Sequence, residues 1–385
     1  MRCHGFRAVH ILFAVIKFHQ MSTSLIFDLS LAKLASLLVE WGEPAYRTRQ
    51  IWHGLYRNFW NTPEEFTNLP GALRLKLTES LEFNILVRSS TLQSSDGETV
   101  KTLFQLNDGK AIETVLMKYD PFEVPQHEQI EYSGQGRRTL CISTQVGCAM
   151  GCVFCATGQM GFKRHLSSGE IVAQVMYYAR MLHDQGEVLT NVVVMGMGEP
   201  FHNYENTMTA LDQLNDPSGY NFGARRFTIS TVGLVPAIRR FASEKRQFNL
   251  AISLHAVDDA LRASILPVSK NYLIDELLEA SRDYVAVTGR RITFEWALVY
   301  GLNDTPEQAH LLASKLKGLL CHVNVIPLNP TDGYSGKAST RLRANEFKNI
   351  LTRSGVPCTI RLRRGVDIQA GCGQLESILY KSIQK

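Results

Sequence analysis

Hydrophobic and polar positions follow a helical period over the first part of the chain. Over residues 29–41 leucines recur every three or four positions, and Gly42 follows where such a helix would end. Residues 44–58 and 70–81 show the same kind of period. We therefore expect a small helical domain over residues 21–84.

The second of these helices admits two interpretations. Its basic and aromatic side chains suit contacts with an RNA backbone and stacking on bases. The same helix also reads as an amphipathic core helix with Ile51, Trp52 and Leu55 buried. The side chains that favour RNA are Tyr46, Arg47, Arg49, Trp52, His53, Tyr56 and Arg57.

The period then changes from that of helices to that of strands. Asp96-Gly97 and Asp108-Gly109 are hairpin turn signals between runs rich in strand-forming residues. They predict a three-stranded meander over about residues 86–118. Residues 120–138 are polar and rich in turn formers, so we expect a loop there and a meander-plus-loop region over 85–138.

From residue 139 onward, predicted strands alternate with predicted helices such as 168–182, 271–287 and 306–319. This alternation predicts an α/β fold with a parallel sheet, and six or seven units suggest a full or partial β/α barrel over 139–385. In such barrels the chemistry gathers at the carboxyl ends of the strands. The strands are expected at 140–144, 191–195, 227–231, 249–254, 292–298, 323–328 and 358–362.

Composition narrows the class of protein only a little. The 385 residues are 45% hydrophobic and 20% charged, as in ordinary globular proteins, and a net charge of +5 permits a nucleic-acid partner without requiring one. Eight cysteines in so long a chain favour a reducing compartment, hence the cytoplasm. Residues 1–20 faintly resemble a signal peptide, but we expect a start-site artefact before Met21 or a disordered tail, and no membrane association.

Three cysteines form the most informative motif. Cys148, Cys152 and Cys155 have the spacing C-x3-C-x2-C, which suits three ligands of a [4Fe–4S] cube whose fourth iron stays open. Zinc and buried structural thiols are the alternatives. Zinc usually takes four ligands in paired C-x2-C spacings, and the nearest extra candidate, His165, lies ten residues beyond Cys155.

Several predicted strands end in residues that could bind a cofactor. The second strand runs into Gly196-Met197-Gly198-Glu199-Pro200, where glycines allow close approach of the backbone and a carboxylate can bind an amine. Each such strand end taken alone is more often a turn or a cap. Together they favour a cofactor site in the same layer as the cysteines, formed by Gly198, Glu199, Ser230, Thr231, Ser253, Leu254, His255 and Asn329.

The cysteine motif with an aromatic residue before its last cysteine, together with the Gly-x-Gly-Glu-Pro strand end, resembles the radical S-adenosylmethionine (SAM) superfamily. The strings at 141–148, 252–255 and 371–375 are similar to the RlmN/Cfr family of RNA adenine methyltransferases, and more similar to its RlmN branch. The resemblance extends from about residue 29 to the end of the chain.

This resemblance implies a role for each matching residue. Cys148, Cys152 and Cys155 would hold one [4Fe–4S] cluster per chain. Cys372 would be S-methylated, Cys141 would be its resolving partner, and Glu113 would accept a proton. The SAM contacts would be Gly198, Glu199, Ser230, Ser253, Leu254, His255 and Asn329.

The resemblance also implies a reaction. One SAM would methylate Cys372, and a second would yield a radical that takes hydrogen from the methylated cysteine. The resulting carbon radical would add to carbon 2 of adenine in 23S rRNA or tRNA. Glu113 would remove the ring proton, and Cys141 would release the product by forming a disulfide. A flavodoxin or ferredoxin would supply electrons, and the enzyme would act as a monomer.

Other interpretations remain open at this stage. The same machinery could methylate carbon 8 of adenine, as in the Cfr branch, or the chain could be a non-catalytic iron–sulfur RNA-binding protein. Cys372 and Cys141 could be buried structural thiols, which is the interpretation kept for Cys321 and Cys358. Glu113 could be a solvated carboxylate. A final set could be either a solvated face or a phosphate-binding group, namely Arg361, Arg363 and Arg364.

Overall fold

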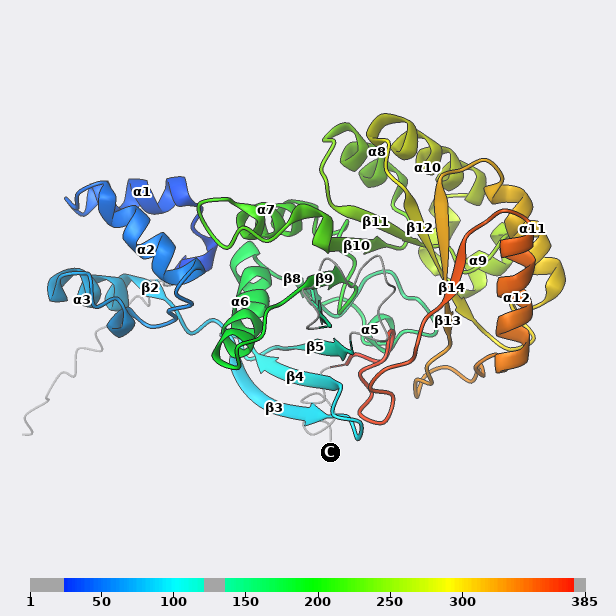
Figure 1. Cartoon of the computed structure of the whole chain (residues 1–385), viewed down its shortest axis with the longest axis horizontal. Coiled ribbons are helices and arrows are strands. Elements are labelled where there is room, and N and C mark those ends of the chain that lie inside the picture. The colour runs from blue at the N-terminus through cyan, green and yellow to red at the C-terminus, as the bar shows by residue number, and fades with distance from the viewer. Residues whose placement is uncertain (1–23, 121–135, 377–385) are drawn as a thin grey trace, which may run out of the picture.

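The computed structural model describes residues 24–120 and 136–376 (Figure 1). The expectation of a tail over residues 1–20, and that of a loop over most of 120–138, lie outside the described residues. The prediction that the loop lasts to residue 138 is wrong at its end. Arg137 and Arg138 already pair with Tyr119 and Lys118 of the neighbouring strand.

A ten-stranded sheet organises the molecule. Its first seven strands are mutually parallel and the last three antiparallel, and β14 and β3 form its two edges, so the barrel is partial and not closed. In spatial order the strands are β14 (Cys358–Ile360), β13 (Cys321–Pro327), β12 (Ile292–Leu298), β11 (Asn249–Ser253), β10 (Phe227–Thr231), β9 (Asn191–Val194), β6 (Arg137–Cys141), β5 (Ala111–Tyr119), β4 (Thr99–Gln105) and β3 (Val87–Gln93).

The strand predicted at 140–144 is shifted in the structure, where β6 ends at Cys141. The next residues leave the sheet to form the short strand β7 (Gln145–Val146), which pairs with β8 (Arg164–His165) on the far side of the cysteine loop. The chain therefore turns away from the sheet a few residues earlier than its apolar pattern suggests.

Long helices cover the outer side of the curved sheet (Figure 1). Helix α6 begins with a capping box in which Ser167 and Glu170 satisfy each other's backbone N–H groups. Two helices are short: α5 (Ala156–Gln159), which directly follows Cys155, and α9 (Asp259–Ile265), which follows β11. The long helices are α6 (Ser168–Asp184), α7 (Tyr204–Asn215), α8 (Val235–Ser243), α10 (Ile274–Thr288), α11 (Pro306–Leu316) and α12 (Arg341–Arg353).

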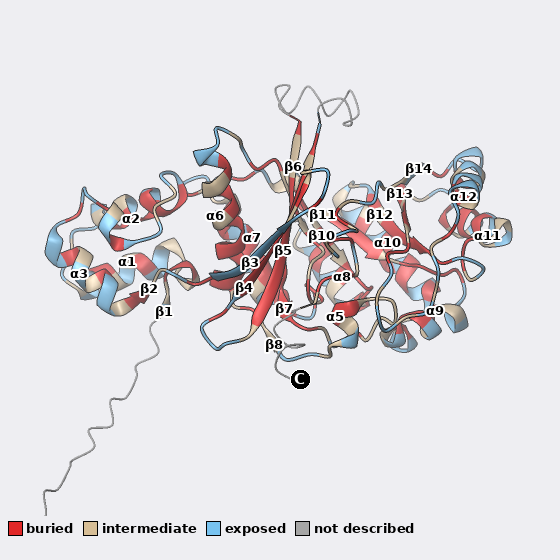
Figure 2. Cartoon of the chain, turned by 90° about the horizontal axis from the view of Figure 1, so that it is seen from below, coloured by how far each residue is buried: buried red, intermediate tan, exposed pale blue. Residues whose placement is uncertain are grey.

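The meander continues the barrel sheet and does not form a separate layer. Gly97 and Gly109 take positive φ angles of 75° and 77° in the two predicted hairpin turns. Strand β5 then pairs antiparallel with β6, so one sheet joins the meander to the barrel. Figure 2 shows β4 and β5 largely buried, whereas every residue of β3 is exposed.

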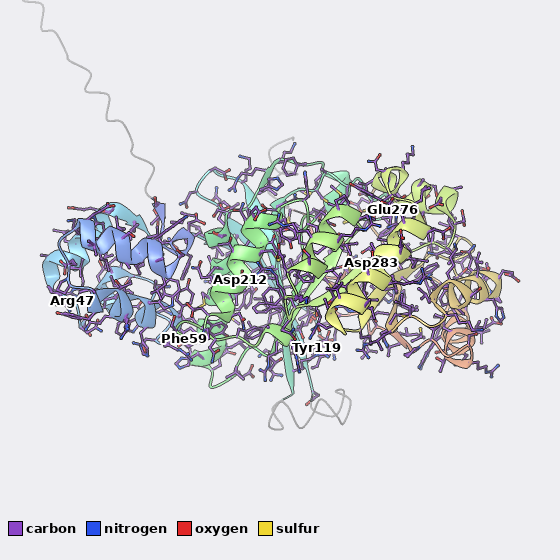
Figure 3. All side chains as sticks on the ribbon, turned by 90° about the horizontal axis from the view of Figure 1, so that it is seen from above. Arg47, Phe59, Tyr119, Asp212, Glu276 and Asp283 are labelled. Carbon is purple, nitrogen blue, oxygen red and sulfur yellow. The ribbon has the colours of Figure 1, made fainter. Side chains whose placement is uncertain are left out.

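The N-terminal helices form a small unit at one end of the molecule, where Figure 3 labels Arg47. It contains α1 (Leu31–Glu40), α2 (Tyr46–Tyr56) and α3 (Gly71–Ser80), together with the parallel pair β1 (Ser24–Leu25) and β2 (Leu81–Glu82). The core-helix interpretation of α2 is confirmed, and it places Trp52 and Tyr56, two of the side chains that favour RNA, in the core. Ile51, Trp52, Leu55 and Tyr56 are buried, and Tyr46, Arg49, His53 and Arg57 are exposed.

Asp28 connects this helical unit to the barrel. Its Oδ1 accepts hydrogen bonds from the N–H of Gly169 and, at 3.0 Å, from the hydroxyl of Ser168 in the first turn of α6. An acidic group at this position also interacts favourably with the helix dipole. From α7, Gln213 donates to the carbonyl of Phe27 at 3.0 Å. In the described part of the chain, no helix is long and apolar enough to cross a membrane.

Candidate active site

Two neighbouring cavities contain most of the residues singled out in the sequence. The first spans about 1030 Å³, part of it open to solvent, at the carboxyl ends of β9 to β13. The second spans about 540 Å³, also partly open to solvent, between β6, β13 and the segment after β14. Five residues line both cavities, so the two are adjacent: Met195, Ile326, Asn329, Cys372 and Leu375.

The cysteine loop forms one wall of the first cavity, to which all three thiols contribute. Backbone hydrogen bonds fix the loop, from Cys148 N to Gly161 O at 3.2 Å and from Val153 N to Ile265 O at 3.1 Å. Burial raises the pKa of each thiol, to about 12 for Cys148, and the nearby thiols raise the pKa of Cys148 and Cys152 further. The three thiols are thus close neighbours in a buried site.

The donor set fits an iron–sulfur cluster better than zinc. His165, the candidate fourth zinc ligand, has its Nδ1 3.1 Å from the side-chain amide of Gln145 and its ring against His202. Among the described residues, no three His, Cys, Asp or Glu side chains are arranged as ligands of a single ion. Three thiols on one wall of a cavity that continues beyond them suit one thiolate for each of three irons.

The Gly-x-Gly-Glu-Pro turn brings a carboxylate to the first cavity. Gly198 has a φ of 101°, and a Cβ there would lie 2.5 Å from the Cβ of Gln145, so glycine is required. Glu199 accepts hydrogen bonds from the N–H of Phe201 at 3.0 Å and of Val232 at 2.8 Å. Burial raises the pKa of Glu199 to about 7 in spite of these bonds. An ammonium group in the cavity would stabilise its ionised form.

His255 lines the same cavity in a defined tautomer. Its Nδ1 accepts the N–H of Ala297 at 2.9 Å, so the neutral ring carries its proton on Nε2 and can donate from there. Burial and, to a smaller extent, Arg262 lower the pKa of His255 to about 3, so the ring stays neutral near pH 7. Phe154 packs edge-on against the ring at a centroid distance of 5.1 Å.

Asn329 offers an unused acceptor to the first cavity. Its Nδ2 donates to the carbonyl of Cys372 at 3.0 Å, and its buried Oδ1 has no hydrogen-bond partner within the described residues. Buried polar atoms are normally paired, so this oxygen suits a donor on a bound cofactor. Gly198, Ser230 and Ser253 also line the cavity, as predicted.

Leu254 does not line the cavity, unlike the other predicted SAM contacts. Its side chain is buried in the hydrophobic core, and its N–H donates to the carbonyl of Glu295. The alternation of side chains at the end of β11 was the available signal, because Ser253 and His255 line the cavity and the residue between them points to the opposite face.

Arg262 is a site residue that the sequence analysis missed. Its guanidinium is buried and donates to the carbonyls of Val232 at 2.6 Å, Leu254 at 3.1 Å and Ser253 at 3.2 Å. It therefore holds together the loops after β10 and β11, which form part of the cavity wall. Its pKa is lowered to about 10 by burial. Nothing in its sequence context, the last turn of the short helix α9, distinguishes it from a solvated arginine.

Cys372 lies where the two cavities meet. The cavities make its side chain accessible to solvent, yet protein surrounds it closely enough that burial raises its pKa to about 11. Two hydrogen bonds connect the segment of Cys372 to helix α5, which follows the cysteine loop. Ala156 N donates to Gly373 O at 2.7 Å, and Thr157 Oγ1 donates to Leu375 O at 2.6 Å.

Cys141, at the end of β6, lines the second cavity together with Cys372. Burial raises the pKa of Cys141 to about 12, and Cys372 raises it further. Arg361 acts in the opposite direction on both thiols, because its positive charge lowers each pKa. The structure thus brings together two cysteines that are far apart in the sequence.

The idea that the three arginines form a solvated face is wrong for Arg361. All three line the second cavity, and Arg361 is only partly exposed. Arg364 lies 3.6 Å from Asp96 and over the ring of Tyr119. The second cavity therefore has a basic wall, of which Arg363 is the exposed member.

Glu113 is not a solvated carboxylate. Only 1% of the residue is exposed, and its Oε1 lies 3.0 Å from the ammonium of Lys101, an ion pair rather than an aligned hydrogen bond. Its Oε2 accepts the N–H of Glu376 at 2.8 Å. Burial raises the pKa of Glu113 to about 7 against the opposing effect of Lys101. Glu113 lines neither cavity, although Leu375, adjacent to its partner Glu376, lines both.

Lys101 was also missed, although the sequence contains a signal for it. The Asp108-Gly109 turn pairs Leu103 with Glu113 and Lys101 with Val115. Since alternate residues of a strand share a face, Lys101 and Glu113 must lie diagonally on the same side of the hairpin. A lysine placed beside a glutamate on the same face of the strand pair was the available indication.

Comparisons with known proteins agree with this geometry. The profile of the Radical SAM superfamily matches residues 142–313, and that of the Ribosomal RNA large subunit methyltransferase N-terminal domain matches residues 25–83. The Dual-specificity RNA methyltransferase RlmN 1 of Myxococcus xanthus is 49% identical over 92% of this chain and 95% of its own length. The Ribosomal RNA large subunit methyltransferase N of Nitrosopumilus maritimus is 43% identical, covering 90% and 96%.

A solved structure has the same overall fold. The crystal structure of a radical SAM methyltransferase from Sphaerobacter thermophilus superposes with a TM-score of 0.86 at 49% sequence identity. The match covers 92% of this chain and 99% of that one.

Proposed function

Because this chain belongs to the RlmN family of radical SAM methyltransferases, we propose that it methylates carbon 2 of adenine in RNA through an S-methylated Cys372. The family resemblance implies that its targets would be adenine 2503 of 23S rRNA and adenine 37 of tRNA. The observation that carries this proposal is the position of Cys372, between the cavity of the cysteine triad and the cavity of Cys141.

The residues present fit the cofactors of this chemistry. When bound, one [4Fe–4S] cluster per chain and two SAM molecules per turnover supply a 5′-deoxyadenosyl radical and a methyl group. Cys148, Cys152 and Cys155 would hold the cluster. The groups that would hold SAM are the backbone at Gly198, the carboxylate of Glu199, the hydroxyls of Ser230 and Ser253, His255 Nε2 and Asn329 Oδ1.

Cys372 would be the methyl carrier. Its thiolate takes the methyl group by displacement, forming an S–C bond while the sulfonium S–C bond of the donor breaks. The nearby charge of Arg361 favours this thiolate by lowering the pKa of the thiol. A position between the two cavities gives the carrier access to the donor on one side and to the base on the other.

Glu113 and Cys141 would complete the reaction. Glu113 takes the proton from carbon 2 of the adenine once that carbon is bonded to the carrier, and the unpaired electron left by the radical addition passes to the external electron carrier, which restores the closed-shell ring. The Cys141 thiolate then attacks the Cys372 sulfur, so an S–S bond forms while the S–C bond breaks. The electron pair of that bond stays on the transferred carbon, which takes a proton from solvent and becomes the methyl group. A dithiol reductant would restore both cysteines.

We assign RNA contacts to two regions. Arg363 on the basic wall of the second cavity suits phosphates near the target base. The helical domain of residues 21–84 offers the exposed face of α2, with Tyr46, Arg49 and His53, for the remainder of the RNA. The sheet extension of 85–138 and the barrel of 139–385 would carry the chemistry. The enzyme would act in the cytoplasm as a monomer and receive electrons from a flavodoxin or ferredoxin.

The test uses a strain that lacks its own adenine-C2 methyltransferase, complemented with the wild type or with Cys372→Ala. Its rRNA and tRNA are digested and analysed by mass spectrometry against 2-methyladenosine and 8-methyladenosine standards. We expect 2-methyladenosine with the wild type alone. Its restoration by Cys372→Ala would contradict the mechanism, and 8-methyladenosine as the sole product would assign carbon 8. A non-catalytic iron–sulfur protein would yield neither nucleoside.

A further inference from the structure

Two buried residues of the meander hold the segment that carries Cys372. Lys101 on β4 donates from Nζ to the carbonyl of Gln369 at 3.2 Å, three residues before the cysteine. Glu113 on β5 accepts the N–H of Glu376 at 2.8 Å, four residues after it. The 3.0 Å ion pair between Lys101 and Glu113 joins these two attachments. The segment around Cys372 is therefore held on both sides by a single charged pair.

The cost of burying this pair argues for a role beyond packing. Lys101 is 3% exposed and Glu113 is 1% exposed. Desolvating two such ions costs several kcal/mol each, and a well-packed apolar pair of similar volume is often as stable or more stable. Apolar side chains at these positions could hold β4 against β5, but they could neither bind the Gln369 carbonyl nor keep a carboxylate ionised.

We propose that Lys101 is a positioning residue that orients the Glu113 carboxylate and fixes the segment of Cys372 next to it. The inference rests on the proposed function, in which Glu113 takes a proton from an adenine bonded to Cys372. Lys101 contacts both the proton acceptor and the segment of the methyl carrier, although these two come from distant parts of the chain.

The charges around Glu113 define what Lys101 contributes. Lys101 faces it from β4 and Glu376 from the C-terminal segment, while the sulfur of Met197 lies 3.3 Å from its backbone N–H. Burial raises the pKa of Glu113, Lys101 lowers it and Glu376 raises it slightly, to about 7 in sum. Without the charge of Lys101 this pKa would lie above 7, and most of Glu113 would be protonated at neutral pH.

The experiment compares reconstituted wild type with Lys101→Met, Lys101→Gln and Lys101→Arg. The rate of methyladenosine formation on an rRNA fragment is measured from mildly acidic to mildly alkaline pH, together with 5′-deoxyadenosine formation. In wild type the rate should fall as pH drops through about 7. In Lys101→Met and Lys101→Gln this fall should begin at least about one pH unit higher, with roughly a tenfold loss at neutral pH. Lys101→Arg should restore the wild-type profile.

A matched control lies on the next strand. Lys118 on β5 forms a partly exposed ion pair with Glu187 at 3.4 Å, and neither residue lines a cavity. Lys118→Met should leave the pH profile unchanged. In Lys101→Met, RNA bonded to Cys372 should also accumulate on denaturing gels, since slower proton removal delays release of the product.

A double variant separates positioning from general damage. If Lys101 fixes the Cys372 segment in order to place it beside the Glu113 carboxylate, both of its contacts act through Glu113, and adding Lys101→Met to Glu113→Gln should cause no further loss of rate. An independent loss in that background, or an unshifted pH profile in both Lys101→Met and Lys101→Gln, would overturn the proposal. Failure of the proposed function would look different, because the wild type itself would then produce no methyladenosine.

Discussion

The two cavities of this protein are built in opposite ways. The first is formed mainly by the carboxyl ends of consecutive parallel strands, so most of its residues follow one another in chain order from Cys148 to Asn329, and Cys372, Gly373 and Leu375 of the C-terminal segment complete it. The second joins β6 near the middle of the chain to residues 361–375 near its end. The first site follows directly from the topology of the sheet. The second exists only because one irregular segment folds back onto the meander.

The manner of construction matches the different tasks proposed for the two cavities. In the first, backbone hydrogen bonds, Arg262 and close glycine contacts fix the wall, which suits a site that holds cofactors in one geometry. In the second, Cys372 lies on a segment without helix or strand, held by a few polar contacts. Because Cys372 on this segment lines both cavities, its sulfur can meet one chemical partner in each.

Loss of one cluster ligand should have the largest effect, because the reactions proposed for both cavities depend on the cluster. We expect Cys152→Ser to lose most iron and sulfide and to reduce methyladenosine formation by more than about 100-fold, beyond the range for residues that merely support metal ligands. Iron and sulfide analysis after reconstitution provides the measurement. Cys321→Ala is the matched control, since this cysteine is buried in the core of β13 and should leave iron content unchanged.

Loss of Cys141 should block only the step proposed for this cysteine in the second cavity, which is release of the product. We expect Cys141→Ala to abolish repeated turnover but still to form one covalent RNA adduct per enzyme, because release alone requires this thiol. Denaturing gels with labelled RNA, followed by peptide mass spectrometry, should locate the adduct on Cys372. A Cys141→Ala enzyme that releases methylated RNA at the wild-type rate would show that the second cavity has another role.

Gly198→Ala tests how rigid the first cavity is. The added Cβ would lie 2.5 Å from the Cβ of Gln145 at a φ of 101°, so the turn must shift. Strain of about 1–3 kcal/mol should raise the KM for SAM roughly tenfold with a smaller effect on kcat. Gly318 is the matched control, because it also has a positive φ, 77°, but an added Cβ there would meet no atom within 4 Å. Gly318→Ala should therefore leave the KM for SAM unchanged.

Arg361→Met should have the smallest effect and concerns only the second cavity. Without its charge the pKa of Cys372 should rise beyond about 11, which lowers the thiolate fraction at any pH below that value. Alkylation of Cys372 by iodoacetamide should slow about three- to tenfold at mildly alkaline pH, while iron content stays constant. Arg361→Lys should recover much of the rate, and equal rates in Arg361→Met and wild type would remove Arg361 from the thiol chemistry.

The same contrast explains what could be predicted from sequence. Most barrel strands were predicted within a residue or two, and β10 and β12 exactly, because their apolar runs are long and the turns between them are clear. The residues at their ends were found because strand order places them in one layer. Leu254 was the exception: it lies in the predicted layer, but its side chain points into the core and not into the first cavity.

Cys141 and Cys372 of the second cavity, together with Glu113 outside it, were identified by resemblance, and their surroundings were not. A glutamate on a hairpin strand is ordinarily solvated, and nothing within the hairpin reveals that the C-terminal segment covers Glu113. Arg361 likewise reads as a surface residue until that segment brings two thiols next to it. Contacts between distant segments depend on tertiary packing, on which local patterns carry no information.

Helix α6 connects the two ends of the molecule mechanically. Asp28 of the helical unit is bonded to its first turn, and Gln174, two turns later, bonds to Thr114 on β5 and to Ser143 just after β6. At a rise of 1.5 Å per residue these attachment points are only about 10 Å apart along the helix. The exposed face of α2 and the thiol pair are therefore held at a constant separation. An RNA that contacts both must present its adenine at that fixed span, so the shape of the RNA, and not only the bases beside the target, would determine which molecules are modified.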